Sequence, residues 1–153
     1  MSIFRGGICM KNRTFIGAFL FGMGIIGMLD GIILHQIFQF HSVYMYTSRF
    51  NQIVSDGLFH LLVTLIVLIG GYLLWVSDSK KLPKPKHLFW ASFLLGAGVF
   101  NLIEGIINHH ILQIHHVYYR TNNILLFDLL YDGLSIILIS SGFYLFLLSK
   151  KKT

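Results

Sequence analysis

The chain has 153 residues, of which 55% are hydrophobic and only 12% are charged. This composition is too apolar for an ordinary soluble domain, and the length leaves room for one domain. The net charge of +6 does not indicate nucleic-acid binding, because ten of the twelve Lys and Arg residues flank apolar segments that share one side of a membrane. The single cysteine excludes an intramolecular disulfide.

Four apolar segments are long enough to cross a bilayer, which requires about 20 residues of helix. We therefore expect an all-α fold, a four-transmembrane-helix bundle built from a tandem repeat of two-helix units. The four expected spans are 14–40, 53–75, 88–114 and 124–148. The expected boundaries are an N-terminal tail at 1–13, a single membrane domain at 14–148 with repeats at about 14–75 and 88–148 around a linker at 76–87, and a basic C-terminal tail at 149–153.

Basic residues are distributed unevenly around these spans. They precede the first span, follow the fourth and fill the proline-containing linker, whereas only Arg49 and Arg120 lie in the other connections. Because positively charged segments stay in the cytoplasm, we expect both termini and the linker inside a cell membrane. The connections at 41–52 and 115–123 would then face outward.

A histidine-rich motif occurs twice, at an offset of 74 residues. The first copy is Asp30-Gly-Ile-Ile-Leu-His-Gln-Ile-Phe-Gln-Phe-His-Ser42, and the second is Glu104-Gly-Ile-Ile-Asn-His-His-Ile-Leu-Gln-Ile-His-His116. The carboxylate, the glycine and two histidines coincide, which indicates a tandem duplication. Each copy contains two spans, so we expect the copies to be related by an approximate two-fold axis along the membrane normal.

The second span of each half begins with an Asp-Gly-Leu sequence. We align Asp56 with Asp132 at an offset of 76, which makes the second outer loop two residues longer than the first. His60 shares a helix face with Asp56, and Ile136 stands at its aligned position. Asp128 and Asp132 are also four residues apart.

Glycines recur at the same internal spacing in the first and third spans. Small residues let helix backbones approach closely in lipid. We expect the first span to pack beside the third, with four glycines near that contact: Gly24, Gly31, Gly98 and Gly105. The alternative is clearance for a flat cofactor between the helices.

The ionisable groups fall at one level of the expected bundle. With a rise of about 1.5 Å per residue, His35 and Asp56 lie near the outer boundary and Asp30 lies deeper. At about 100° per residue, Asp30 and His35 differ by roughly 140° around an α-helix, so they cannot both point at the bundle axis. Ionisable groups are costly in hydrocarbon, which favours either a function or mutual pairing.

The two histidine-rich motifs resemble those of a bacterial membrane family known only as the domain of unknown function 2243 family. The resemblance covers nearly the whole chain and is carried by Asp30-Gly-Ile-Ile-Leu-His-Gln and by Asn101-Leu-Ile-Glu-Gly…His109-His…His115-His-Val117. The chain departs from the family at Ser42, where the family has a second histidine, and at Phe40, where it tends to have tryptophan. The resemblance implies a multi-pass protein of the bacterial cell membrane and implies no reaction.

Three functions fit these residues. The first is a metal or haem site that opens to the outer face, since histidine binds Zn, Cu and iron. Its expected ligands are His35, His60, His109, His115, His116 and His41, with Asp30, Asp56, Glu104 and Asp132 as direct or supporting ligands. Haem between His35 and His109 is one version of this site, and copper or a di-metal centre is another.

The other two functions use the same residues differently. One is a proton-coupled carrier or proton relay, because perturbed histidines and carboxylates exchange protons near neutral pH. The other is a non-catalytic assembly subunit whose polar groups join helices. The expected partners are the lipid bilayer and either a second copy or another membrane protein, and whether the protein is an enzyme stays open among these functions.

The charge distribution predicts the orientation. A cysteine introduced as Thr47→Cys or Thr121→Cys should react with a membrane-impermeant thiol reagent in intact cells, because both positions lie in the expected outer connections. Labelling that occurs only after lysis would reverse the predicted orientation.

Overall fold

The structure is a computed structural model that describes residues 2–82 and 84–150. The described residues form four long helices, α1 (Ser2–Asp30), α2 (Arg49–Trp75), α3 (Pro85–Glu104) and α4 (Ile124–Lys150). Two π-helical segments, η1 (Gly31–Ile37) and η3 (Gly105–Ile111), continue α1 and α3, and a short 3₁₀ turn, η2 (Ser79–Lys81), lies in the linker. No strand occurs in this part of the chain, which confirms the predicted all-α class.

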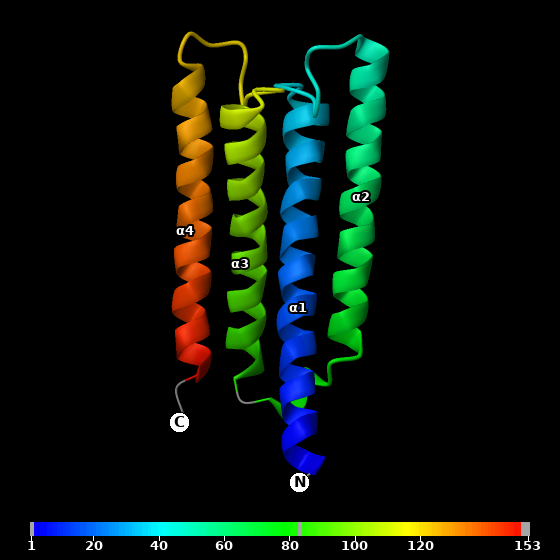
Figure 1. The fold of residues 1–153 in the computed structure, drawn as a ribbon, viewed down its shortest axis with the longest axis vertical. Coiled ribbons are helices and arrows are strands. Elements are labelled where there is room, and N and C mark those ends of the chain that lie inside the picture. The colour runs from blue at the N-terminus through cyan, green and yellow to red at the C-terminus, as the bar shows by residue number, and fades with distance from the viewer. Residues whose placement is uncertain (1, 83, 151–153) are drawn as a thin grey trace.

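Each of the four helical units is long and apolar enough to cross a membrane. The candidate spans are Asn12–Ile37, Arg49–Trp75, Pro85–Ile111 and Ile124–Lys150. All four exceed the length of about 20 residues that a bilayer requires. α1 begins and α4 ends at the same end of the molecule, where the linker also lies, and the connections that follow η1 and η3 lie at the opposite end (Figure 1).

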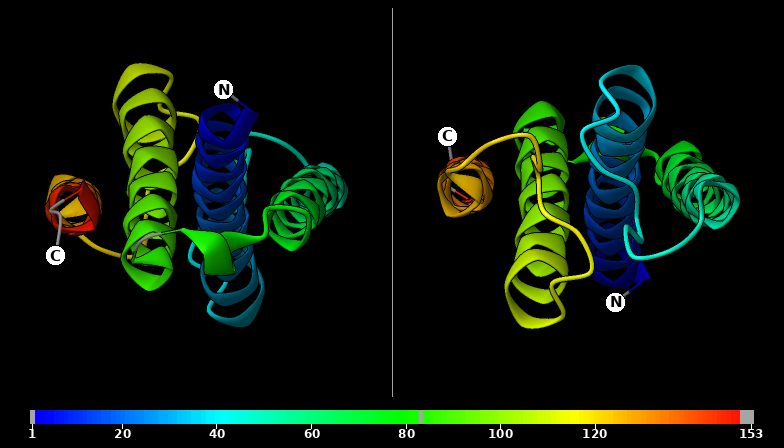
Figure 2. Two further views of the ribbon diagram at one scale, coloured as in Figure 1. Left: turned by 90° about the horizontal axis from the view of Figure 1, so that it is seen from below. Right: turned by 90° about the horizontal axis from the view of Figure 1, so that it is seen from above.

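The centre of the molecule is formed by α1 and α3. These two helices cross each other, while α2 packs on the outer side of α1 and α4 packs on the outer side of α3 (Figure 2). Among the described residues, α2 and α4 make no comparable contact with each other. In the most apolar 18 residues of each span, only 11% are buried in α2 and α4, against 33% and 39% in the two central spans. Most of α2 and α4 is therefore left to face lipid.

Two glycines set the distance between the central helices. A Cβ atom at Gly22 would overlap the backbone of Phe93, and a Cβ atom at Gly96 would overlap the backbone of Phe19. The absence of a side chain at both positions therefore lets the backbones of α1 and α3 touch, as small residues commonly do between helices in lipid.

The prediction that Gly24, Gly31, Gly98 and Gly105 lie at the α1–α3 contact is wrong, although all four lie at helix contacts. The first two face α2, and the last two face α4. Two residues along an α-helix correspond to a rotation of about 200°. Because Gly22 faces α3, Gly24 points to the other side of α1 and contacts α2.

Replacement of a contact glycine should destabilise the central pair. Gly96→Ala should lower the free energy of unfolding by about 1–3 kcal/mol, because the added methyl group overpacks a tight contact. Gly71→Ala is the matched control, since nothing lies within 4 Å of a Cβ atom there. Thermal unfolding in detergent measures both variants, and equal melting temperatures would contradict the assigned contact.

Candidate metal centre

Both histidine-rich motifs lie where an α-helix changes into a π-helix. At the ends of η1 and η3, backbone N–H groups bond carbonyl oxygens five residues back. Phe38 donates to Ile33 over 2.9 Å, and Leu112 donates to Ile107 over 2.7 Å. π-Helical turns are rare and are frequently found at functional sites. In such a turn, side chains five residues apart lie on one face.

This backbone geometry corrects the helical-wheel prediction for Asp30 and His35. Instead of pointing in different directions, they approach each other, with Nε2 of His35 3.1 Å from Oδ2 of Asp30. In the second half, Nε2 of His109 lies 3.3 Å from Oε1 of Glu104. The wider π-helical turn therefore pairs one carboxylate with one imidazole at the end of each central helix.

Each π-helix is followed by a glutamine in the left-handed backbone conformation. The φ angles are 50° at Gln39 and 49° at Gln113. This conformation is uncommon outside glycine and marks a sharp change of chain direction. After the turn, the next histidine of each motif, His41 or His115, is buried.

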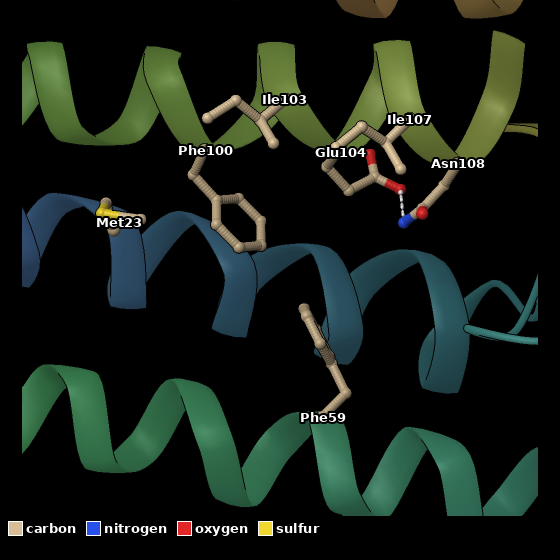
Figure 3. A pocket seen from close by; sticks show the side chains of 7 residues that line it. All are labelled: Met23, Phe59, Phe100, Ile103, Glu104, Ile107 and Asn108. Carbon is tan, nitrogen blue, oxygen red and sulfur yellow. Dashed lines mark hydrogen bonds between the residues drawn. The ribbon is translucent and has the colours of Figure 1, made fainter. Parts of the chain in front are cut away.

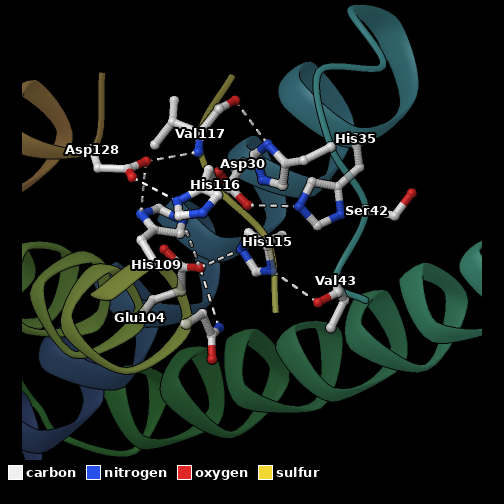
Figure 4. Close-up of polar contacts among 12 residues, drawn as sticks. Asp30, His35, Ser42, Val43, Glu104, His109, His115, His116, Val117 and Asp128 are labelled. Carbon is white, nitrogen blue, oxygen red and sulfur yellow. Dashed lines mark hydrogen bonds and ion pairs between the residues drawn. The ribbon is translucent and has the colours of Figure 1, made fainter. Parts of the chain in front are cut away.

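Two compact groups of side chains result, which we call the first and second triads (Figure 4). Within each triad, one candidate ligand atom from every residue lies within 4.8 Å of the others. The four histidines are at most 3% exposed. The members are Asp30, His35 and His41 in the first triad and Glu104, His109 and His115 in the second.

The loops that follow η1 and η3 join the two triads. Nδ1 of His41 donates to the carbonyl oxygen of Val117 over 3.0 Å, and Nδ1 of His115 donates to that of Val43 over 2.8 Å. The two imidazole rings stack with centroids 4.7 Å apart and planes 6° from parallel. The loop of each half therefore holds a histidine of the other half.

These backbone bonds also define the tautomer of the stacked rings. A carbonyl oxygen only accepts hydrogen bonds, so Nδ1 carries the hydrogen and Nε2 of the neutral ring keeps its lone pair. Burial and the neighbouring His115 lower the pKa of His41 to about 3. His41 is therefore neutral at physiological pH, with Nε2 available to bind a cation.

A further carboxylate lies behind the first triad. Oδ1 of Asp56 lies 3.1 Å from Nδ1 of His35 and accepts a hydrogen bond from the backbone N–H of Val43 over 2.8 Å. Asp56 therefore fixes both the imidazole of His35, on η1, and the loop that leads into α2.

Asp128 takes the corresponding position in the second half. Its Oδ1 accepts from the backbone N–H of Val117 over 3.0 Å and lies 3.6 Å from Nδ1 of His109. The alignment of Asp56 with Asp132 is therefore wrong. The contacts equate Asp56 with Asp128, at an offset of 72, and make the second connection two residues shorter rather than longer.

Two other pairs of residues support this offset. Gly70 contacts α1 and Gly142 contacts α3, and each is close to the backbone of its neighbour. His60 and Asp132 each lie against the first glycine of a π-helix. Aligning the glycines, rather than the Asp-Gly-Leu sequences, would have identified Asp128 as the equivalent carboxylate.

The other predicted residues lie beside or outside the triads. Nδ1 of His116 lies 2.7 Å from Oδ2 of Asp128, and Nε2 of His110 lies 2.8 Å from Oδ2 of Asp132. His60, on α2, belongs to neither triad, and its Nε2 is buried without a hydrogen bond to the described chain. Of the six histidines expected as ligands, four thus lie in the triads. His116 lies beside the second triad, and His60 lies apart from both.

Three of the triad histidines have an oxygen acceptor near both ring nitrogens. They are His35, His109 and His115. A neutral imidazole carries one hydrogen and can satisfy only one of the two acceptors. The other nitrogen then presents a lone pair to an oxygen, which is repulsive unless a proton or a metal cation lies between them. The arrangement therefore requires additional positive charge.

The fold and this cluster define the class of the protein: a multi-pass helical membrane protein with histidines and carboxylates gathered at one end. The chain belongs to the family described as "Predicted membrane protein (DUF2243)", whose model matches residues 17–149. This match confirms the family that the histidine-rich motifs predicted. No curated protein and no solved structure gives a significant match to the chain.

The contacts of Asp128 predict its effect on stability. Asp128→Ala removes the acceptor for the N–H of Val117 and the partner of His116, and should cost about 3 kcal/mol. Asp128→Asn keeps an acceptor oxygen for the loop and should cost clearly less. Thermal unfolding of the two variants measures this difference, and equal losses would show that the loop contact contributes nothing.

Proposed function

We propose that the protein binds two divalent transition-metal ions, one at each triad, near the outer face of a bacterial cell membrane. Each triad offers two histidine nitrogens and one carboxylate, a set that suits Zn²⁺ or non-haem Fe²⁺. Three protein ligands leave coordination positions open, which is typical of catalytic rather than structural metal sites. A centre of this kind would bind and activate a small molecule.

The observation that carries the proposal is the excess of acceptors around the buried imidazoles. Nε2 of His35 and both ring nitrogens of His109 are buried without a hydrogen bond to the described chain, although carboxylate oxygens lie beside them. A cation at the Nε2 atoms of His35 and His109 would replace the repulsion between lone pairs by coordination. Asp56 and Asp128 would then orient the imidazoles from behind, as carboxylates commonly do at metal sites.

The charge of the cluster supports two ions. Its four carboxylates are Asp30, Asp56, Glu104 and Asp128. Ionised carboxylates away from water are strongly disfavoured unless a partner balances them. Two divalent cations would balance four negative charges without requiring any imidazole to be charged.

The packing favours metal ions over haem. The cavity between the triads, which His35 and His115 both line, has a volume of about 30 Å³. The centroids of these two rings are 6.3 Å apart. Such a cavity admits an ion or a water molecule, whereas sites for larger ligands have volumes of about 300–1,000 Å³.

A proton relay is the second candidate, because imidazoles and carboxylates alternate in one network. That network stays at one end of the helices. The sequence has no Asp, Glu, His, Lys or Arg in the segments 14–29, 61–75, 88–103 and 133–149. A relay across the bilayer would need ionisable groups at more than one depth. The distribution therefore supports local proton transfer at the centre rather than transport.

The proposed orientation rests on the basic residues. The start of α1, the linker and the end of α4 carry most of the Lys and Arg residues, and they lie at the end opposite the triads. The positive-inside rule favours the cytoplasm for that end. The triads would then lie near the outer surface.

Metal analysis of the purified protein tests the proposal. Wild-type protein titrated with Zn²⁺, or with Fe²⁺ without oxygen, should bind two ions per chain. His35→Ala and His109→Ala should each lose an ion, because each removes a ligand from one triad. A saturating ion should stabilise the wild type by about 3 kcal/mol at a hundredfold excess over its Kd, measured as a rise in melting temperature.

Two further variants make this test specific. His87→Ala, near the start of α3 and far from the triads, should keep both ions. Asp30→Asn preserves the size of the side chain and should lose metal without unfolding the protein. If the wild type binds neither ion, or if the triad variants retain full metal content, the metal proposal is wrong and the pairs serve to join helices.

A further inference from the structure

A second pocket opens beside the triads and is largely apolar (Figure 3). Its volume is about 220 Å³. Five apolar side chains, from Met23 on α1 to Ile107 on η3, form its walls, and two polar residues, Glu104 and Asn108, also line it. Glu104 belongs to the second triad, so the polar residues mark the end at which the pocket meets that triad.

The mouth of this pocket faces the region that lipid would occupy. Ile103 and Ile107 line it and are 52% and 41% exposed. Both residues lie within the candidate span Pro85–Ile111. A molecule would therefore enter the pocket from the bilayer and not from water.

The pocket meets the small cavity between the triads. Phe59, Glu104 and Asn108 line both spaces, and His35 and His115 line the cavity. Nδ2 of Asn108 donates to Oε1 of Glu104 over 3.2 Å. This bond uses the amide nitrogen of Asn108 and leaves its carbonyl oxygen to accept a hydrogen bond from a ligand.

The first half of the chain keeps the carboxylate of this pocket but lacks its amide. At the offset of 74 residues, Leu34 corresponds to Asn108 and Leu29 corresponds to Ile103. The carboxylate and the histidines of the motif are retained in both halves, whereas the amide is present only in the second. Asn108 therefore gives the second half a hydrogen-bonding group that the first half lacks at the aligned position. Helix packing alone does not require this difference.

We propose that this pocket is a lateral entrance by which a lipid-dissolved amphiphile with a hydroxyl head group reaches the centre, an inference that rests on the proposed metal function. The apolar walls hold the chain of the molecule, and the carbonyl oxygen of Asn108 accepts from its hydroxyl group. The pocket is smaller than the volume of about 300 Å³ at which sites enclose a whole ligand, so the rest of the chain stays in lipid. The substrate class is a long-chain alcohol or a lipid-soluble phenol.

Photo-crosslinking in phosphatidylcholine vesicles tests the entrance. The probe is a long-chain alcohol with a diazirine in mid-chain, and the control probe is the corresponding alkane. The alcohol should label the pocket walls, as mapped by mass spectrometry. Ile103→Trp fills the mouth and should largely abolish this labelling, whereas Leu29→Trp, at the aligned lipid-exposed position, should leave it unchanged.

The head group is tested by a third variant. Asn108→Leu introduces the residue of the first half and removes the acceptor. It should reduce the preference for the alcohol over the alkane about five- to tenfold, the effect of losing one hydrogen bond. An unchanged preference would show that Asn108 does not bind the head group.

Metal content measured on the same samples separates this proposal from the one on which it rests. Labelling spread over the exposed faces of α2 and α4, or unchanged in Ile103→Trp, overturns the entrance even when two ions are bound. Pocket-specific labelling of a protein that binds neither Zn²⁺ nor Fe²⁺ supports the pocket and overturns the metal function.

Discussion

The arrangement of the cluster depends on imidazoles that each lie between two acceptors in a region sheltered from water. His35 lies between Asp30 and Asp56, at 3.1 Å from each. Lipid offers neither carboxylate another hydrogen-bonding partner. The contacts with His35 therefore fix the positions of α1, η1 and α2 relative to one another. The backbone N–H of Val43 bonds Asp56, the same carboxylate that contacts His35, and this bond adds the loop between η1 and α2 to the constraint.

The π-helical ends of α1 and α3 make the arrangement possible. A continued α-helix would separate the carboxylate and the histidine of each motif, whereas the wider turn brings residues five apart together. The turns at Gln39 and Gln113 then send the chain across the molecule. As a result, His41 is held by the loop of the second half and His115 by the loop of the first. Neither half can orient both of its own histidines.

Features that depend on a short stretch of residues, such as the spans and the repeated motif, were predicted from the sequence. The π-helical turns and the equivalence of Asp56 with Asp128 were missed, because they depend on contacts between distant parts of the chain. Hydropathy was sufficient for four spans, and the repeated motif was sufficient to nominate His35 and His109 together with their carboxylates. A wheel of 3.6 residues per turn could not anticipate a π-helix, because its hydrogen bonds depend on the tertiary contacts of the helix end. Asp128 was missed for a related reason: the Asp-Gly-Leu sequence at Asp132 is the stronger local match, but the contacts follow the glycine spacing.

The two halves keep the triads and differ around them. Three aligned pairs change character, namely Leu34 and Asn108, Ser42 and His116, and Phe59 and Tyr131. In two of these pairs a polar residue of the second half replaces an apolar or purely aromatic one, and in the third an imidazole replaces a hydroxyl. The ring of Tyr131 lies 5.3 Å from that of His109. A symmetric pair of ions with one shared task would need no such difference. The asymmetry instead suits the proposed centre if the two triads have different tasks. The first triad would only bind its ion, and the second, on the side where the apolar pocket opens, would also bind the molecule that enters through that pocket.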